Sequence, residues 1–164
     1  MGIHDLIRLL AEKKIDFVLV GGLAVALQGY QRVTMDVDVV LAMDAGNLER
    51  FIAAARNAGL RPTIPVPIES LARPELVEQW HREKGMLAFS LRGAEARATV
   101  LDVLVKPVVP YADLRRDALM VEMGTAQVPV ASIPHLIAMK TGTGRGKDRI
   151  DIDELQKLMS GNTP

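Results

Sequence analysis

Apolar and polar positions follow two different periods along the chain, and each change of period marks a boundary between predicted elements. Near the start, apolar residues recur at helical spacing and predict an amphipathic helix: Ile3, Leu6, Ile7 and Leu10. The run DFVLV at residues 16–20 is rich in β-branched and aromatic residues. It predicts a buried strand that Gly21 and Gly22 end.

The next three elements complete the order strand, helix, strand, helix. Residues 23–28 can form a short helix that Gly29 stops, and residues 33–42 predict a second strand. Asp44 can cap the helix that follows, and Gly59 suits its carboxyl-terminal end. The apolar positions of that helix share one face: Leu48, Phe51, Ile52 and Ala55.

The remaining pattern predicts a second, more irregular part of the same domain. Four prolines between residues 61 and 74 indicate a loop, and Pro74 can open a helix toward Arg82. The later elements are a hairpin (85–91 and 96–105), a helix (111–119), a hairpin or edge pair (121–130), a helix from Ser132 through Lys140, a glycine-broken loop (141–149) and a final helix (150–159). We expect one domain over residues 1–164, with a core at about 15–105 and a helical part at about 106–164.

Composition limits the kind of partner. Lys and Arg together number 20, as do Asp and Glu, so the whole chain exerts no general attraction on nucleic acid. Cysteine is absent, which excludes disulfides, thiolate zinc sites and cysteine nucleophiles. The amino terminus lacks the pattern of a signal peptide, and the longest apolar run, residues 17–27, is too short to span a membrane. We expect a cytoplasmic protein with no membrane partner.

Two carboxylates occupy the second predicted strand. Strand periodicity places Thr34, Asp36 and Asp38 on one face and five apolar residues on the other: Val33, Met35, Val37, Val39 and Leu41. Two carboxylates about 6 Å apart at an effective dielectric of about 20 repel by about 3 kcal/mol. A positive group should offset that repulsion. Asp102 occupies a similar position in a different apolar strand.

A divalent cation is the simplest positive group for such a face. Carboxylate oxygens are the ligands that Mg²⁺ or Mn²⁺ takes, and three of them from two strands could hold metal against a nucleoside triphosphate. The glycine pair adds a second feature, because backbone N–H groups after a strand can face phosphate and glycine allows close approach. The alternative is that Asp36 and Asp38 face water on an exposed sheet surface.

The combination matches a known pattern: a hydrophobic residue, Gly, Gly or Ser, some nine to thirteen residues, then Asp, hydrophobic, Asp, hydrophobic. Val20-Gly21-Gly22, the thirteen residues 23–35, and Asp36-Val37-Asp38-Val39 satisfy it. Leu101-Asp102-Val103 is similar to the strand that carries the third carboxylate. Residues 15 to 105 therefore resemble the DNA polymerase β-like nucleotidyltransferase superfamily.

The resemblance extends to small bacterial members of the AbiEii-like group, which includes toxins of toxin–antitoxin pairs. In that comparison Arg32 and Thr34 support the site, and Lys140 contacts the triphosphate, with Asp148 a weaker candidate. The alternative for Lys140 is a solvated lysine at a helix carboxyl terminus, which the helix dipole favours. The resemblance implies an α/β (α+β) fold with a mixed, mostly antiparallel sheet, helices on one face and an open catalytic face.

The activity implied is metal-dependent transfer of a nucleoside monophosphate from a nucleoside triphosphate to an acceptor hydroxyl, with release of pyrophosphate. Asp36, Asp38 and Asp102 would hold Mg²⁺ or Mn²⁺, and Gly21 and Gly22 would receive the β- and γ-phosphates. Asp102 would also help deprotonate the acceptor. A tRNA end, a protein hydroxyl and a small molecule such as an aminoglycoside remain open as acceptors. The toxin resemblance favours RNA or protein, with an antitoxin as partner.

Two alternatives come from other classes of protein. One is a catalytically silent nucleotide-binding or protein-interaction module on the same fold, and the other is a purely structural protein. Three mutually repelling carboxylates argue against the silent module, because it has no reason to keep Asp36, Asp38 and Asp102 together. A purely structural protein predicts that Asp38→Asn stabilises the fold and alters no activity.

Overall fold

The computed structural model describes residues 1–161 of the chain, so the predicted end of the domain at residue 164 lies outside the described part. Its elements follow in the order α1 (Ile3–Glu12), β1 (Phe17–Val20), α2 (Gly21–Leu27), β2 (Val37–Leu41), α3 (Ala45–Asn57), β3 (Arg61–Pro62), the 3₁₀ helix η1 (Ile68–Ala72), α4 (Pro74–Lys84), β4 (Ala88–Arg92), β5 (Leu101–Leu104), α5 (Tyr111–Arg116), β6 (Leu119–Met123), β7 (Ala126–Val130), α6 (Ile133–Lys140) and α7 (Gly146–Met159).

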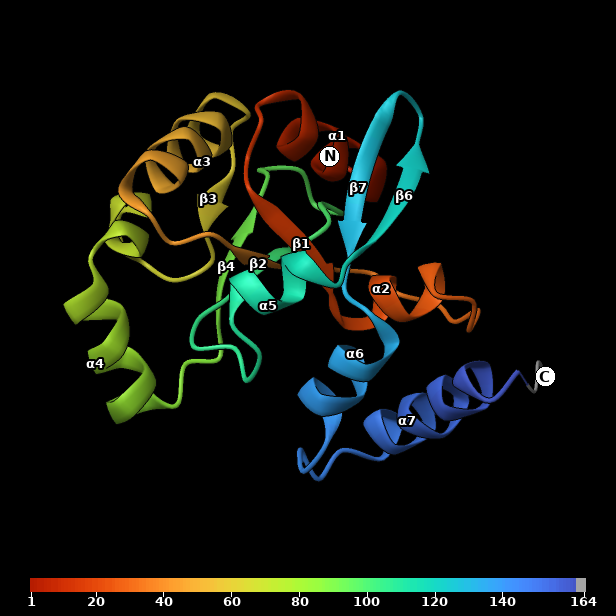
Figure 1. Cartoon of the computed structure of the whole chain (residues 1–164). Helices are drawn as coiled ribbons and strands as arrows, with labels where there is room; N and C mark the ends of the chain where they lie inside the picture. Colours follow the sequence, from red (N-terminus) through yellow and green to blue (C-terminus); the bar gives the residue numbers. More distant parts are fainter. Residues whose placement is uncertain (162–164) are drawn as a thin grey trace.

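The strands form one seven-stranded sheet in the order β3-β4-β5-β2-β1-β7-β6. The pairs β1–β7 and β2–β5 are parallel and the other four are antiparallel. This arrangement confirms the predicted α/β class with a mixed, mostly antiparallel sheet. The hairpin β6–β7 belongs to the same sheet as the strands of the predicted core (Figure 1).

The centre of the sheet is buried by helices that come from both ends of the chain. All four residues of β1 are buried, so both faces of this strand are covered. Helix α1 buries Leu6, Ile7 and Leu10 and contacts β2 and β7, while α5 contacts β1. In Figure 1, α5 lies in front of the sheet and α1 behind it.

The elements with clear local signals are confirmed. The Asp44 side chain accepts a hydrogen bond of 3.0 Å from the backbone N–H of Asn47 and caps α3, as predicted. Ser132 caps α6 in the same way, and Pro74 occupies the first turn of α4. The hairpin β4–β5 is confirmed with shorter arms than predicted.

The second strand is shorter than predicted. It begins at Val37 instead of Val33, and residues 30–36 form neither helix nor strand. Val33 and Met35 are 87% and 77% exposed, so their predicted place on a buried face is wrong. The cause is the length of the neighbours, because β1 ends at Val20, the partner of Asp38, and β5 starts at Leu101, the partner of Val37.

Other element boundaries also differ from the prediction. Helix α2 starts at Gly21 instead of residue 23, and α7 starts at Gly146 instead of residue 150. The proline-rich stretch contains β3 and η1, and α5 ends at Arg116, so that Leu119 opens β6. Within the described residues, the helices are all too short or too polar to cross a membrane.

Candidate active site

Four strands each place one residue in a single row across the sheet. Asp38 of β2 is the register partner of Asp102 in the parallel strand β5. On either side, Ser90 of β4 is opposite Asp102 and Val20 of β1 is opposite Asp38. Register partners point to the same face of a sheet. The row Ser90, Asp102, Asp38, Val20 therefore sets two carboxylates together at the point where β1 turns into α2.

The positive charges near this row do not balance its carboxylates. Burial raises the pKa of Asp38 to about 7, with further contributions from the charge of Asp102, a hydrogen bond between the two carboxyl groups and the charge of Asp36, while Lys140 opposes the shift. Burial and the charge of Asp102 also raise the pKa of Asp36, against the effect of Lys147. The hydroxyl of Ser90 donates a hydrogen bond to Asp102. Such a site favours a cation or a proton between its carboxylates.

Asp36 lies beside this row instead of within it. It precedes the first residue of β2 and is exposed, because the strand is shorter than the sequence predicted. Across residues 1–161, the structure groups no three acidic or histidine side chains closely enough to enclose a metal ion. The two carboxylates in register, Asp38 and Asp102, form the part of the predicted metal site that is already assembled.

The two glycines bring the backbone against the carboxylates. Gly21 has φ +69°, and a Cβ atom there would lie 2.7 Å from Cγ of Asp38. A Cβ atom on Gly22 would lie 3.2 Å from Oγ1 of Thr34 and 3.4 Å from Cζ of Arg32. Any larger residue would have to displace these side chains. The glycines thus leave room for the side chains of three predicted site residues.

Lys140 is buried instead of solvated, so the alternative interpretation of this residue is wrong. Only 10% of its side chain is exposed, and its Nζ atom lies 3.3 Å from Oδ1 of Asp148 and 3.0 Å from Oδ2 of Asp151. Asp151 also forms an ion pair with Arg32. The hydroxyl of Thr34 donates a hydrogen bond of 3.3 Å to the carbonyl of Asp36.

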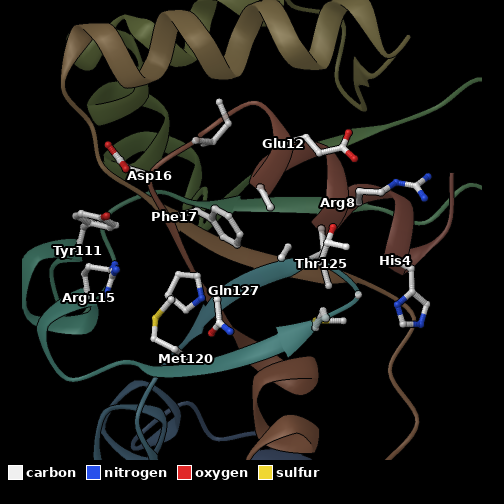
Figure 2. A pocket seen from close by; sticks show the side chains of 17 residues that line it. His4, Arg8, Glu12, Asp16, Phe17, Tyr111, Arg115, Met120, Thr125 and Gln127 are labelled. Atoms are coloured by element: carbon white, nitrogen blue, oxygen red, sulfur yellow. The ribbon is translucent and has the colours of Figure 1, made fainter.

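A cleft of about 320 Å³ collects these groups. All the predicted site residues except Thr34 line it, together with the exposed cations Arg145 and Lys147 and the exposed Leu87. A larger pocket of about 650 Å³ lies between α1, α5 and the hairpin β6–β7. Figure 2 shows that pocket, with Tyr111, Arg115 and Gln127 among its lining residues. It contains none of the predicted site residues, so the smaller cleft is the candidate active site.

Sequence reasoning missed Ser90 and Asp151. The signal for Ser90 was available, because it is the polar residue in the arm of the hairpin that pairs with Asp102. Asp151 gave no such signal, since its two partners, Arg32 and Lys140, are distant in sequence or in a different helix.

Known proteins of similar fold share this architecture. The lincosamide antibiotic adenylyltransferase LnuA, solved with lincomycin bound, is 16% identical, with a TM-score of 0.60 and 94% of each chain covered. ANT(2″)-Ia, solved in complex with adenylyl-2″-tobramycin, is 13% identical, with a TM-score of 0.55, 98% of this chain and 94% of that chain covered. An antigenic nucleotidyltransferase-like protein from Paracoccidioides brasiliensis is 18% identical, with a TM-score of 0.52, 96% of this chain and 73% of that chain covered. At these identities the likeness shows the fold.

The fold is thus that of the nucleotidyltransferases. The sequence profile described as "Nucleotidyl transferase AbiEii toxin, Type IV TA system" matches residues 5–163, so the chain belongs to this AbiEii family and is a nucleotidyltransferase. Comparison with curated proteins gives no significant match. The predicted family and enzyme class are confirmed.

Proposed function

We propose that the cleft transfers a nucleoside monophosphate from a nucleoside triphosphate to a hydroxyl group of RNA or protein, in a metal-dependent reaction. The observation that carries this proposal is the pair Asp38 and Asp102, in register on adjacent strands and directly beside the turn at Gly21. The two carboxylates favour a cation, and the backbone turn beside them allows a phosphate to approach closely. This combination suits a triphosphate with its metal.

The carboxylates fit the metal that the family implies. Asp38 and Asp102 offer hard oxygen ligands. Burial and the neighbouring charge of Asp102 raise the pKa of Asp38, which supports the proposal of a positive charge at this position. Asp36 is the third ligand candidate, since it lies at the end of the exposed segment 30–36 and lines the same cleft. When bound, Mg²⁺ or Mn²⁺ would neutralise the phosphates and polarise the α-phosphorus.

The chain's own residues bind and orient the reactants. The backbone turn at Gly21 and Gly22 would receive the β- and γ-phosphates, and Arg32 and Lys140 supply positive charge in the same cleft. Asp102, which accepts a hydrogen bond from the Ser90 hydroxyl, would take the proton of the acceptor hydroxyl. The acceptor oxygen bonds to the α-phosphorus, the bond from that phosphorus to the bridging oxygen breaks, and pyrophosphate leaves.

RNA is the acceptor that the charges near the cleft favour. Arg145 and Lys147 are exposed in its lining, and Arg149 is exposed on the next turn of α7. Exposed cations bind phosphate backbones irrespective of sequence, even on a chain with no net charge. The toxin family also supports an antitoxin as the partner that opposes the reaction, in the cytoplasm where nucleotides and Mg²⁺ are available.

A transfer assay tests this proposal. The purified protein is incubated with each nucleoside triphosphate labelled at the α-phosphate, Mg²⁺ or Mn²⁺, and separate cellular fractions of RNA, protein and small molecules. Asp38→Asn/Asp102→Asn is the inactive comparison, and Asp153→Asn, an exposed carboxylate of α7, is the control for the substitution itself. Label in RNA or protein that requires Asp38 and Asp102 supports the proposal. Label found only in small molecules would instead indicate a small-molecule acceptor, of the antibiotic type bound in the structures of LnuA and ANT(2″)-Ia.

A further inference from the structure

A largely buried ionic cluster borders the cleft, whose lining includes Lys140 and Asp148. Asp148 and Asp151 of α7 are 1% and 2% exposed, and both pair with Lys140 at the end of α6. Asp148 also accepts hydrogen bonds of 2.7 Å from Thr143 and 2.8 Å from Arg145. Buried charges are stable only when paired in this way.

The two aspartates hold different parts of the chain. Burial opposes ionisation, but the Thr143 hydrogen bond and the charges of Lys140 and Arg145 keep the pKa of Asp148 below its usual value. Asp148 therefore joins α7 to the loop just before it and to α6. Asp151 instead joins α6 to a segment near the start of the chain, through Lys140 at 3.0 Å and the ion pair with Arg32.

The contact with Arg32 fixes a side chain whose backbone has little other support. Arg32 lies in residues 30–36, which form neither helix nor strand. Its guanidinium nevertheless has a defined place, because Cζ lies 3.4 Å from the position that a Cβ of Gly22 would take. The Arg32 side chain thus connects Asp151 on α7 to the turn at Gly21 and Gly22.

The ionic cluster has a net positive charge. Within the cluster, Arg32, Lys140 and Arg145 carry three positive charges against the two negative charges of Asp148 and Asp151. The charge of Lys140 also acts on Asp38. Ordering two long, flexible cations before a ligand arrives removes part of the entropic cost of binding. Their paired state also holds them in one geometry.

We propose that Asp151 is a positioning residue for nucleotide binding, which fixes the Arg32 guanidinium beside Gly22 and the Lys140 ammonium in the lining of the cleft for the triphosphate. This inference rests on the proposed function. Through Asp151, helix α7 would position the residues that bind nucleotide, although Asp151 itself is buried and does not line the cleft.

The test separates positioning from simple stabilisation. Asp151→Asn keeps the shape of the side chain and removes its charge. Calorimetric titration with each of the four common nucleoside triphosphates should give a dissociation constant at least tenfold higher than in the wild type. The value of kcat at saturation should stay within threefold, because the carboxylate row is untouched. The matched control, Asp153→Asn on the same helix, should change both values by less than twofold.

A lower melting temperature for Asp151→Asn with an unchanged dissociation constant would overturn the inference and leave a purely structural ion pair. A wild type that neither binds nucleotide nor transfers label would instead contradict the proposed function, so the two failures are distinguishable.

Removal of one buried charge can unfold the chain. A variant that removes one charge of each sign keeps the inference testable in that case. Arg32→Gln/Asp151→Asn removes one charge of each sign. If Asp151 acts through Arg32, the double variant should bind nucleotide within threefold of Arg32→Gln alone. A further tenfold loss would overturn the inference, as would an Arg32→Gln variant that binds as tightly as the wild type.

Discussion

Asp38 of β2 and Asp102 of β5 are register partners in a parallel pair of strands, and their carboxyl groups share a hydrogen bond. The sheet thus forces two acidic groups onto one spot of its surface. Burial and the second carboxylate together raise the pKa of Asp38 to about 7. The fold maintains this pair against electrostatic repulsion, which is expected of a functional site and unfavourable for stability.

Stability should depend on pH through Asp38. The native state holds this proton up to a pH of about 7, whereas the unfolded chain releases it near its ordinary value of 3.8. A raised carboxyl pKa therefore makes stability fall as pH rises between these values. Asp38→Asn should raise the free energy of unfolding at pH 8 by up to about 4 kcal/mol, at about 1.4 kcal/mol for each unit of the pKa shift. Near pH 4 the difference should vanish.

Urea denaturation with a chelator present, at pH 4, 6 and 8, measures this dependence for wild type and variant. A difference that is absent at pH 8, or that grows as pH falls, would contradict the electrostatic account of the pair.

Divalent metal should stabilise the native protein in a way that depends on pH. A metal ion must displace the proton of Asp38, so binding should weaken about tenfold between pH 8 and pH 6. At saturating Mn²⁺ and pH 8, the melting temperature should rise by about 3–6 °C. Thermal unfolding of the wild type, Asp102→Asn and Asp153→Asn measures the effect. Equal stabilisation of all three would show that the metal binds elsewhere.

Gly21→Ala should reduce activity more than the backbone strain alone explains. Its Cβ atom would enter the Asp38 carboxyl group, and its φ of +69° adds about 1 kcal/mol of strain. Gly85→Ala is a matched control, because Gly85 has φ +64° and its Cβ would meet no atom of the described residues within 4 Å. We expect comparable loss of stability from the strain in both variants, but a fall in kcat of at least about tenfold only in Gly21→Ala. Similar kcat values for the two variants would refute the close packing of Gly21 on Asp38.

Ser90→Ala should weaken the action of Asp102. The serine hydroxyl donates to the Asp102 carboxylate, and a hydrogen bond to a charged group contributes about 1.5–3 kcal/mol. We expect kcat/KM to fall by roughly tenfold. Ser160→Ala, at the exposed end of α7, is the control and should retain full activity. An unaffected Ser90→Ala enzyme would indicate that the hydroxyl has no part in the reaction.

Local signals predicted most of the fold. The order of strands and helices, the Asp44 cap and the place of Asp102 within an apolar strand follow from periodicity and capping, which neighbouring residues determine. The start of β2 was wrong because a strand extends only as far as its partners do. That length depends on β1 and β5, which Val33 and Met35 cannot reveal.

The carboxylate pair was predictable from the strands, whereas Arg32, Lys140 and Asp148 were expected only from the family resemblance and Asp151 was not predicted. Asp38 and Asp102 stand out as charges within apolar strands. Placing Asp148 and Asp151 requires the true start of α7 at Gly146, which turns both toward Lys140, and the ion pair of Asp151 with Arg32 joins residues 119 positions apart. Long-range pairs of this kind depend on the packing of helices, for which a single sequence offers no direct signal.

The fate of the labelled phosphate tests the central claim most directly. Parallel reactions receive nucleoside triphosphate labelled at the α- or the γ-phosphate, with Mg²⁺ and the acceptor fraction. The account predicts α-label in the acceptor and γ-label in pyrophosphate, with both lost in Asp38→Asn/Asp102→Asn and retained in Asp153→Asn. Transfer of γ-label to the acceptor, or α-label transfer that survives the loss of both carboxylates, would contradict it.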